Sequence, residues 1–355
     1  MNQFPNLKLQ AIAIGSLPHT NTNDAMELMG RYFKQIPFFP QMTKINKNED
    51  MINQILEGLP SFLDFEGFYS DYNSIILGEN PEKLEKYKIS SAYSAAFFDF
   101  EKFVANTKPD FAKGQIVGPY TFLLSLTGRD GKSAIFDKTL RDIVVKFLSL
   151  KALWIISQIK SANSDTIPII FLDEPSFAGF SENGHFAVTD DEVVNMIKEI
   201  SDIIHKNGAL CGVHCCGECR WDIPISAGVD IINPDVYTYP ENFFEYSKNI
   251  GKFLKNGGKI AWGIVPTKDL AVLKEVTVRN LVEKFKFCVK YLTNSGIDEK
   301  LITDNSLITS SCGVGSLDIE SAGRAMGLVF ELSEILRNDK EILNSVQNNN
   351  NIKRM

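Results

Sequence analysis

The segment ALCGVHCCG, residues 209–217, combines a short apolar run with an imidazole and several thiol side chains. It follows Gly208, where a helical pattern over 190–207 ends, and an apolar run of this length between turn signals is typical of a buried strand. The reactive side chains therefore lie at the carboxyl end of a predicted strand. The same plan, an apolar strand followed by polar residues, is repeated along the chain.

Short apolar runs of this kind alternate with longer amphipathic stretches. The predicted strands are 11–16, 36–40, 114–118, 167–173, 209–214, 229–233, 259–265 and 307–311. The predicted helices are 23–34, 140–161, 190–207, 241–256, 276–293 and 318–337. Eight short strands, buried on both faces and separated by helices, predict the α/β class and a (β/α)₈ TIM barrel.

The length of 355 residues suits a single barrel, which we expect over 1–340. The last residues, 341–355, include a run of asparagines and are expected to form a flexible tail. The stretch 42–113 is longer than one crossover needs and contains helical patterns at 49–57 and 81–107. We expect it to be an elaborated insertion after the second strand that folds over the barrel mouth.

Composition narrows the class of protein. The formal charge is −7, and the 37 basic residues are spread along the chain, which argues against a nucleic-acid partner. The first residues lack the plan of a secretory signal, and no apolar run approaches the ~18 residues of a membrane span, so we expect a cytoplasmic protein without a membrane partner.

Four of the six cysteines lie within 211–219, too close together for a disulfide framework. Their spacing favours metal binding.

The donors for a metal can be named from the strand ends. His214 and Cys216 share one side of their strand, because successive side chains alternate, whereas Cys215 faces the other way. Cys312 follows the last predicted strand and supplies a second thiol. One imidazole and two thiolates suit zinc, and three protein ligands leave one coordination position open, as in catalytic zinc sites.

Other predicted strands also end in polar residues. Ser16 ends the first strand and Gln41 follows the second, while Asp173 and Glu174 follow the fourth and Asp235 the sixth. The carboxyl ends of barrel strands meet at one face, which carries the active site. We therefore expect these side chains to converge on the His214, Cys216 and Cys312 site.

Some of these patterns have a second interpretation. Asp173 and Glu174 precede Pro175 and are also typical of a helix-capping pair. Cys216 and Cys219 have the spacing of half a structural zinc ribbon, although the sequence contains no second Cys-x-x-Cys to complete four sulfur ligands. A histidine at a strand end can also be a core residue that donates to a carbonyl.

Four motifs together resemble a known family. They are Ile14-Gly15-Ser16, Asp173-Glu174-Pro175, His214-x-Cys216 and Cys312-Gly313, in this order along the whole chain. The chain resembles the catalytic barrel of cobalamin-independent methionine synthase, in a short single-barrel form. The wider superfamily includes uroporphyrinogen decarboxylase and the corrinoid-dependent coenzyme M methyltransferases.

The resemblance implies a zinc-dependent thiol methyltransferase that converts homocysteine to methionine. Asp173 would bind the substrate ammonium group and Ser16 its carboxylate, with Glu174 and Gln41 completing the substrate site. Asp235 stands near the position where the family has a glutamate ligand to zinc. The family's additional amino-terminal barrel, which helps to hold a folate donor, is not matched, so we expect a corrinoid protein as partner and methyl donor.

Two alternatives stay open at this point. A decarboxylase of the uroporphyrinogen type would share the barrel and work without a metal, although its arginine-rich amino-terminal motif is not found here. A barrel that binds a thiol or a metal without turnover, or that regulates a corrinoid protein, would retain the same ligand residues.

Overall fold

The computed structural model of the chain describes residues 6–60, 64–128, 130–180 and 188–338. Its centre is one parallel sheet in which the strand order in space follows the order in the sequence. The strands are β1 (Phe111–Val117), β2 (Ile167–Asp173), β3 (Leu210–Cys215), β4 (Ile231–Pro234), β5 (Lys259–Val265) and β6 (Ser306–Ser310). The α/β class is confirmed, and six of the predicted strands are found within a few residues of their expected bounds.

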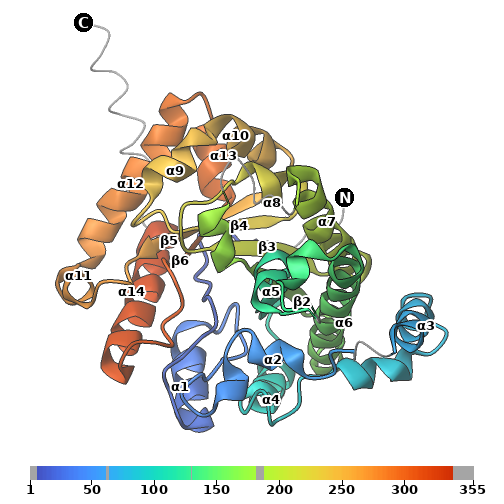
Figure 1. Cartoon of the computed structure of the whole chain (residues 1–355). Coiled ribbons are helices and arrows are strands. Elements are labelled where there is room, and N and C mark those ends of the chain that lie inside the picture. Colours follow the sequence, from blue (N-terminus) through green and yellow to red (C-terminus); the bar gives the residue numbers. More distant parts are fainter. Residues whose placement is uncertain (1–5, 61–63, 129, 181–187, 339–355) are drawn as a thin grey trace, which may run out of the picture.

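Helices surround the strands on the outside (Figure 1). They are α1 (Thr22–Tyr32), α2 (Asn53–Leu56), α3 (Phe65–Ile76), α4 (Phe97–Thr107), α5 (Pro119–Ser125), α6 (Lys138–Ala162), α7 (Asp190–Lys206), α8 (Asp222–Ser226), α9 (Pro240–Glu245), α10 (Ser247–Lys255), α11 (Leu270–Glu275), α12 (Val278–Asn294), α13 (Glu299–Asp304) and α14 (Ile319–Asn338). Short 3₁₀ turns lie at Lys47–Glu49, Pro81–Tyr87, Ala134–Phe136 and Pro175–Gly179.

Helix α7 shows why these segments form amphipathic helices. Thr189 and Glu192 make a capping box, in which each side chain accepts from the other residue's backbone N–H, so the start of the helix is fixed. Apolar residues at helical spacing, including Val193, Ile197 and Ile204, are buried on one face. Burial of this stripe against the sheet supplies most of the stability that a single helix lacks in water.

The predicted strands 11–16 and 36–40 are not strands of the sheet. They make isolated parallel bridges, Ala11 to Ile308 of β6, Ser16 to Gln41, and Phe38 to Lys113 of β1. Glycine and proline explain the interruption: Gly15 has a φ of +138°, outside the extended region of a strand.

Proline has the same effect in the second segment. Pro37 and Pro40 have no N–H to donate to a ladder. Two buried side chains of β1 pair with the carbonyls that the interrupted ladder leaves free. Lys113 Nζ donates to Ile14 O at 2.5 Å, and Gln115 Nε2 donates to Phe39 O at 3.0 Å.

A second, smaller apolar core lies against one face of the sheet. It contains at least one residue from each of the six strands together with residues of the two irregular segments: Leu7, Ile12, Ile36, Phe111, Ile169, Phe171, Leu210, Ile231, Ala261 and Leu307. The amino-terminal segments therefore enclose the same interior as the sheet.

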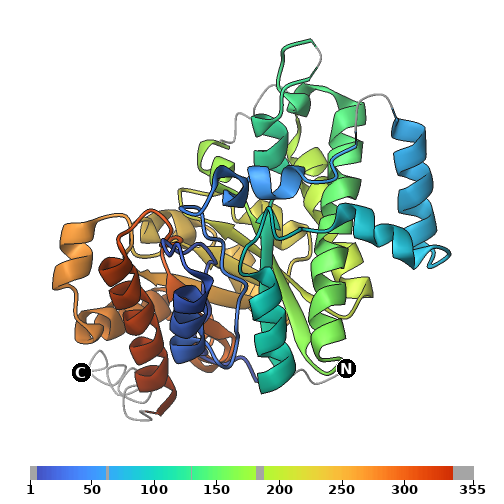
Figure 2. The same ribbon diagram turned by 90° about the horizontal axis from the view of Figure 1, so that it is seen from below.

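The insertion is divided between two places. Near the strand ends, the buried Glu49 carboxylate accepts from the backbone N–H groups of Met42 and Ala95, which ties the insertion together. Helix α3 instead lies against the outside of α6, away from the strands (Figure 2). Only part of the insertion is therefore placed near the mouth, where the whole segment was expected.

Several helix boundaries differ from the prediction. The expected helix 241–256 is divided at Tyr246 into α9 and α10, and α3, α5, α8, α11 and α13 were not predicted. The expected tail 341–355, and the end of the expected domain 1–340, lie outside the described residues. Within the described part of the chain, no helix combines the length and the apolar character needed to cross a bilayer.

Candidate metal centre

His214 is held in one orientation by its neighbours. It lies in β3, in register with Asp173 of β2 and Asn233 of β4. Its Nδ1 is 3.2 Å from the carbonyl oxygen of Asn233, so Nδ1 carries the proton and donates it. The other nitrogen, Nε2, is buried and has no hydrogen-bond partner among the described residues. A lone pair is therefore available on Nε2.

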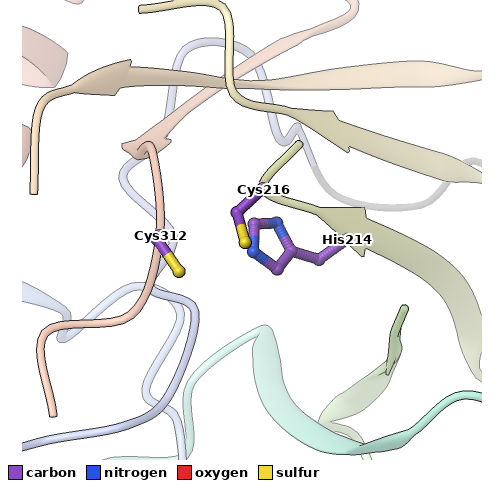
Figure 3. A group of neighbouring side chains, drawn as sticks. All are labelled: His214, Cys216 and Cys312. Carbon is purple, nitrogen blue, oxygen red and sulfur yellow. The ribbon is translucent and has the colours of Figure 1, made fainter. Parts of the chain in front are cut away.

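The two cysteines face this nitrogen. Cys216 follows β3 and Cys312 follows β6, and the potential ligand atoms of His214, Cys216 and Cys312 all lie within 4.8 Å of one another. Figure 3 shows the three side chains pointing toward one another across the ends of the strands. Cys215 is directed elsewhere: its Sγ contacts the carbonyl oxygen of Gly217 at 3.9 Å.

The electrostatics of the group favour ionisation of one of the two sulfur atoms, that of Cys216. The hydrogen bond from Cys312 lowers the pKa of Cys216 to about 4, outweighing burial, and the His214 and Lys268 charges act in the same direction. The same hydrogen bond raises the pKa of Cys312. Burial alone would lower the pKa of His214, but the Cys216 sulfur and the Asp173 carboxylate raise it on balance.

These residues fit a zinc ion. Zinc prefers imidazole nitrogen and thiolate sulfur, and a histidine that ligates zinc usually donates its other N–H to a carbonyl, as His214 does to Asn233. The unpartnered Nε2 is the atom that such an ion would satisfy. The His, Cys, Cys cluster could therefore bind a metal.

Asp173 and Glu174 have different surroundings. Asp173 ends β2, and its Oδ1 is buried with no hydrogen-bond partner among the described residues. Burial raises the pKa of Asp173, an effect that Lys113 and His214 oppose. Its carboxylate is therefore a candidate to receive a cationic group of a substrate.

The Glu174 carboxylate is instead engaged with α5. It accepts from Tyr120 N at 2.9 Å, Thr121 N at 2.8 Å and Thr121 Oγ1 at 2.6 Å. Burial nonetheless raises its pKa to about 7. Glu174 does not cap the turn that follows it, as the helix-capping interpretation requires, but a helix from another part of the chain.

The irregular segments place Ser16 and Gln41 side by side. Ser16 Oγ accepts from Gly315 N at 3.3 Å, in the loop that carries Cys312. A Cβ on Gly313 would lie 2.1 Å from Ser16 Oγ, so a side chain at this position would displace the Ser16 hydroxyl. The Gln41 side chain donates to Gln54 of α2 at 2.7 Å and so faces the insertion.

Asp235 is not in the group of three. One of its oxygens accepts from Thr238 N at 2.9 Å, and the other lies 3.0 Å from Lys268 Nζ. The carboxylate is thus engaged by a backbone N–H and a lysine. Lys268 was not identified from the sequence, although its place shortly after the strand 259–265 is a signal that could have drawn attention to it.

Comparisons with known proteins give distant structural likenesses. No family model and no curated protein sequence matches the chain. A B12-independent methionine synthase from Shewanella sp. W3-18-1, solved with selenomethionine, is 19% identical at a TM-score of 0.48, over 70% of this chain and 67% of that chain. A Bacteroidetes-affiliated GH5 cellulase is 9% identical at a TM-score of 0.44, over 74% and 79% of the two chains.

A third solved structure is a double mutant of the Cellulomonas fimi endo-beta-1,4-mannanase. It is 11% identical at a TM-score of 0.39, over 94% of this chain and 80% of that chain. The three proteins have different activities, and at these scores none of them assigns one to this chain. The function must be argued from the site.

Proposed function

We propose that this protein is a zinc-dependent thiol methyltransferase that methylates homocysteine to methionine. The observation that carries the proposal is the group formed by His214 Nε2, Cys216 Sγ and Cys312 Sγ, all within 4.8 Å, with Nε2 unpartnered. These three residues would hold the ion. Since structural zinc is almost always held by four protein ligands, three ligands favour a site that also accepts a substrate atom.

The chemistry requires a deprotonated thiol at neutral pH. A free thiol has a pKa of about 8.5, and a bound zinc ion would supply the positive charge that deprotonates a coordinating thiol. Because Cys216 and Cys312 bring two negative charges, the substrate sulfur retains its electron density. His214 adds a neutral donor whose orientation is fixed by Asn233.

The remaining residues would orient an amino-acid thiol. Asp173 offers an unpartnered buried carboxylate oxygen to an ammonium group, and Ser16 offers a hydroxyl to a carboxylate. In the transfer, the substrate sulfur forms a bond to the methyl carbon while the bond from that carbon to the donor breaks. The electron pair of the broken bond stays on the donor, and the thiol proton passes to solvent water before the transfer.

We propose a corrinoid as the methyl donor, presented by a separate protein at the strand ends. A folate with an anionic polyglutamate tail would need free cations there, and Lys268 is already paired with Asp235. For the fold we propose a (β/α)₈ barrel whose first two strand positions are irregular. The parallel bridges at Ala11, Ser16 and Phe38, and the shared interior core, support this closure.

The test is methionine formation by the purified protein. Homocysteine is offered with methylcobalamin, with a methylated corrinoid protein or with methyltetrahydrofolate at equal concentration, before and after removal of zinc by a chelator. We expect methionine with the corrinoid donors, a slower reaction with the folate, and recovery of the rate when zinc is returned. Zinc-loaded protein that forms no methionine with any donor would overturn the proposal, and efficient turnover with the folate alone would overturn the donor.

A further inference from the structure

The loop after β5 contacts both loops that carry the cysteines of the candidate metal centre. Cys216 and Cys312 follow β3 and β6, which are separated in the sheet by β4 and β5. No ladder therefore joins the two cysteine loops directly. The loop after β5 carries Thr267 and Lys268, two and three residues beyond the end of the strand. Thr267 makes hydrogen bonds to the Cys312 loop, and Lys268 makes one to the Cys216 loop.

Thr267 is bonded to the Cys312 loop. Its backbone N–H donates to Ser311 Oγ at 3.1 Å, and its Oγ1 donates to the carbonyl oxygen of Cys312 at 3.3 Å. The Cys312 carbonyl also accepts from Ser310 Oγ at 2.8 Å. Thr267 is buried, so these bonds are made with little competition from water.

Lys268 is bonded to the Cys216 loop. Its Nζ donates to the carbonyl oxygen of Cys216 and forms an ion pair with Asp235 Oδ2 at 3.0 Å. The same ammonium group lies 4.7 Å from the centre of the Tyr239 ring, which further restricts it. Asp235 is buried, and its Oδ1 accepts from Thr238 N. Its Oδ2 has no hydrogen-bond partner among the described residues and is held by the charge of Lys268.

We propose that Thr267 and Lys268 are positioning residues that hold Cys216 and Cys312 facing one another, and that Asp235 is the counter-ion of Lys268 instead of a metal ligand. The inference rests on the proposed function only in that a metal occupies the site. The metal site then has three protein ligands. Asp235 after β4 is not a fourth ligand, because its carboxylate is paired with Lys268. Ligands on loops need such support, because small displacements of the donors weaken metal binding.

The test measures metal binding without turnover. Co²⁺ replaces zinc as a spectroscopic probe, and affinity is measured by competition with a chromogenic chelator. The first variant is Thr267→Val, which removes the hydroxyl and keeps the shape. The second is the double variant Lys268→Met, Asp235→Asn, which removes the bond to Cys216 while leaving the net charge of the site unchanged.

We expect each variant to bind Co²⁺ about 10- to 100-fold more weakly than the unaltered protein, with reduced sulfur-to-cobalt absorption. Thr267→Ser should restore binding, because it retains the hydroxyl. The matched controls are Thr293→Val, which removes an equivalent bond to Val289 O far along α12, and Lys8→Met, which removes a similarly exposed lysine paired with Asp304. Both controls should bind Co²⁺ normally.

Asp235→Asn alone tests the ligand set. We expect it to keep the cobalt spectrum of the unaltered protein, since its oxygens are not among the donors. A changed ligand-field spectrum would overturn the assignment of Asp235, and normal affinity in both Thr267→Val and the double variant would overturn the positioning role. Failure of the metal site itself would be recognised separately, by normal Co²⁺ binding in Cys216→Ser and Cys312→Ser.

Discussion

The continuous sheet and the amino-terminal segments share one apolar core but are built differently. β1 to β6 are joined by parallel ladders, whereas 7–41 meets the sheet through isolated bridges at Ala11 and Phe38. The continuous part provides His214, Cys216, Cys312 and Asp173, the residues whose relative positions matter for a metal and a charged substrate. The irregular part provides Ser16 and Gln41.

The difference between the two regions shows that the metal donors lie where parallel ladders fix the backbone. A ladder fixes neighbouring strands in register, so donors that follow different strands are placed reproducibly. Where proline and glycine interrupt the ladder, buried polar side chains of β1 supply the missing hydrogen bonds, as Lys113 and Gln115 do. Loss of a metal donor should therefore reduce function without changing the fold. Loss of Lys113 should instead reduce the stability of the fold without removing the metal donors.

The largest effect is expected for the metal donors of the continuous sheet. The double variant Cys216→Ser, Cys312→Ser should lose zinc essentially completely, and with it methyl transfer, because two of three donors are removed. Zinc content by elemental analysis is the measurement. Cys215→Ser is the control and should retain zinc, since its sulfur faces away from the group. Undiminished zinc in the double variant would overturn the ligand set, and zinc lost from Cys215→Ser but kept in Cys216→Ser would reverse the choice between the neighbouring cysteines.

The next largest effect is expected in the pH dependence of stability. It depends on Lys113 of β1, which donates a hydrogen bond to Ile14 in the irregular amino-terminal segment. Burial lowers the pKa of Lys113 from 10.5 to about 8, partly opposed by the charge of Asp173. Between pH 8 and 10.5 the unfolded chain therefore keeps a proton that the folded chain has lost, so the free energy of unfolding rises with pH across this window. Lys113 should raise the free energy of unfolding by up to about 3 kcal/mol between pH 8 and pH 10.5. This contribution disappears when the pH is lowered to 8.

The measurement is urea denaturation at pH 8 and pH 10.5 for the unaltered protein and for Lys113→Met. The variant lacks this proton equilibrium, so the difference in unfolding free energy between the two proteins should change with pH in favour of the unaltered protein. Other groups that titrate in this range contribute equally to both proteins and cancel. A difference that is the same at both pH values would show that Lys113 has an ordinary pKa in the folded chain.

The two regions also differ in how well the sequence predicted them. Strands 167–173 and 259–265 were placed at their observed bounds, because a continuous apolar run between turn signals decides them locally. Strands 11–16 and 36–40 have the same apolar character, but Gly15 and Pro37 break their ladders, and these local signals were outweighed by the expected barrel. Lys113 gave no sign in the sequence that its charge would be buried.

The site shows a similar division. Alternation along β3 correctly predicted that Cys216 and not Cys215 lies beside His214. By contrast, the sequence placed Glu174 and Asp235 in the site by their strand-end positions and by the family resemblance. Their actual partners are Thr121 of helix α5 and Lys268 of the loop after β5, both distant in sequence, and contacts of this kind have no local signal.

A smaller effect is expected for the substrate residue of the continuous sheet. Asp173→Asn keeps the shape of the side chain but removes the charge that would meet an ammonium group, so methylation of homocysteine should fall roughly 10- to 100-fold, equivalent to about 1.4 to 2.8 kcal/mol. Zinc content should be unchanged, because Asp173 is not among the donors. An unaltered rate at subsaturating homocysteine would show that Asp173 has a structural role only.

The smallest effect is expected for Ser16 in the irregular part. Among the residues that the structure describes, the Ser16 hydroxyl accepts one hydrogen bond, from Gly315 N. This bond is long at 3.3 Å, so Ser16→Ala should lower the free energy of unfolding by no more than about 1 kcal/mol. If the hydroxyl binds the substrate carboxylate, KM for homocysteine should rise several-fold while zinc content stays constant. Thiols without a carboxylate should be used equally well by the variant and the unaltered protein, because they never made this contact. Equal KM values for homocysteine would remove Ser16 from the substrate site and leave the irregular segments with a purely structural role.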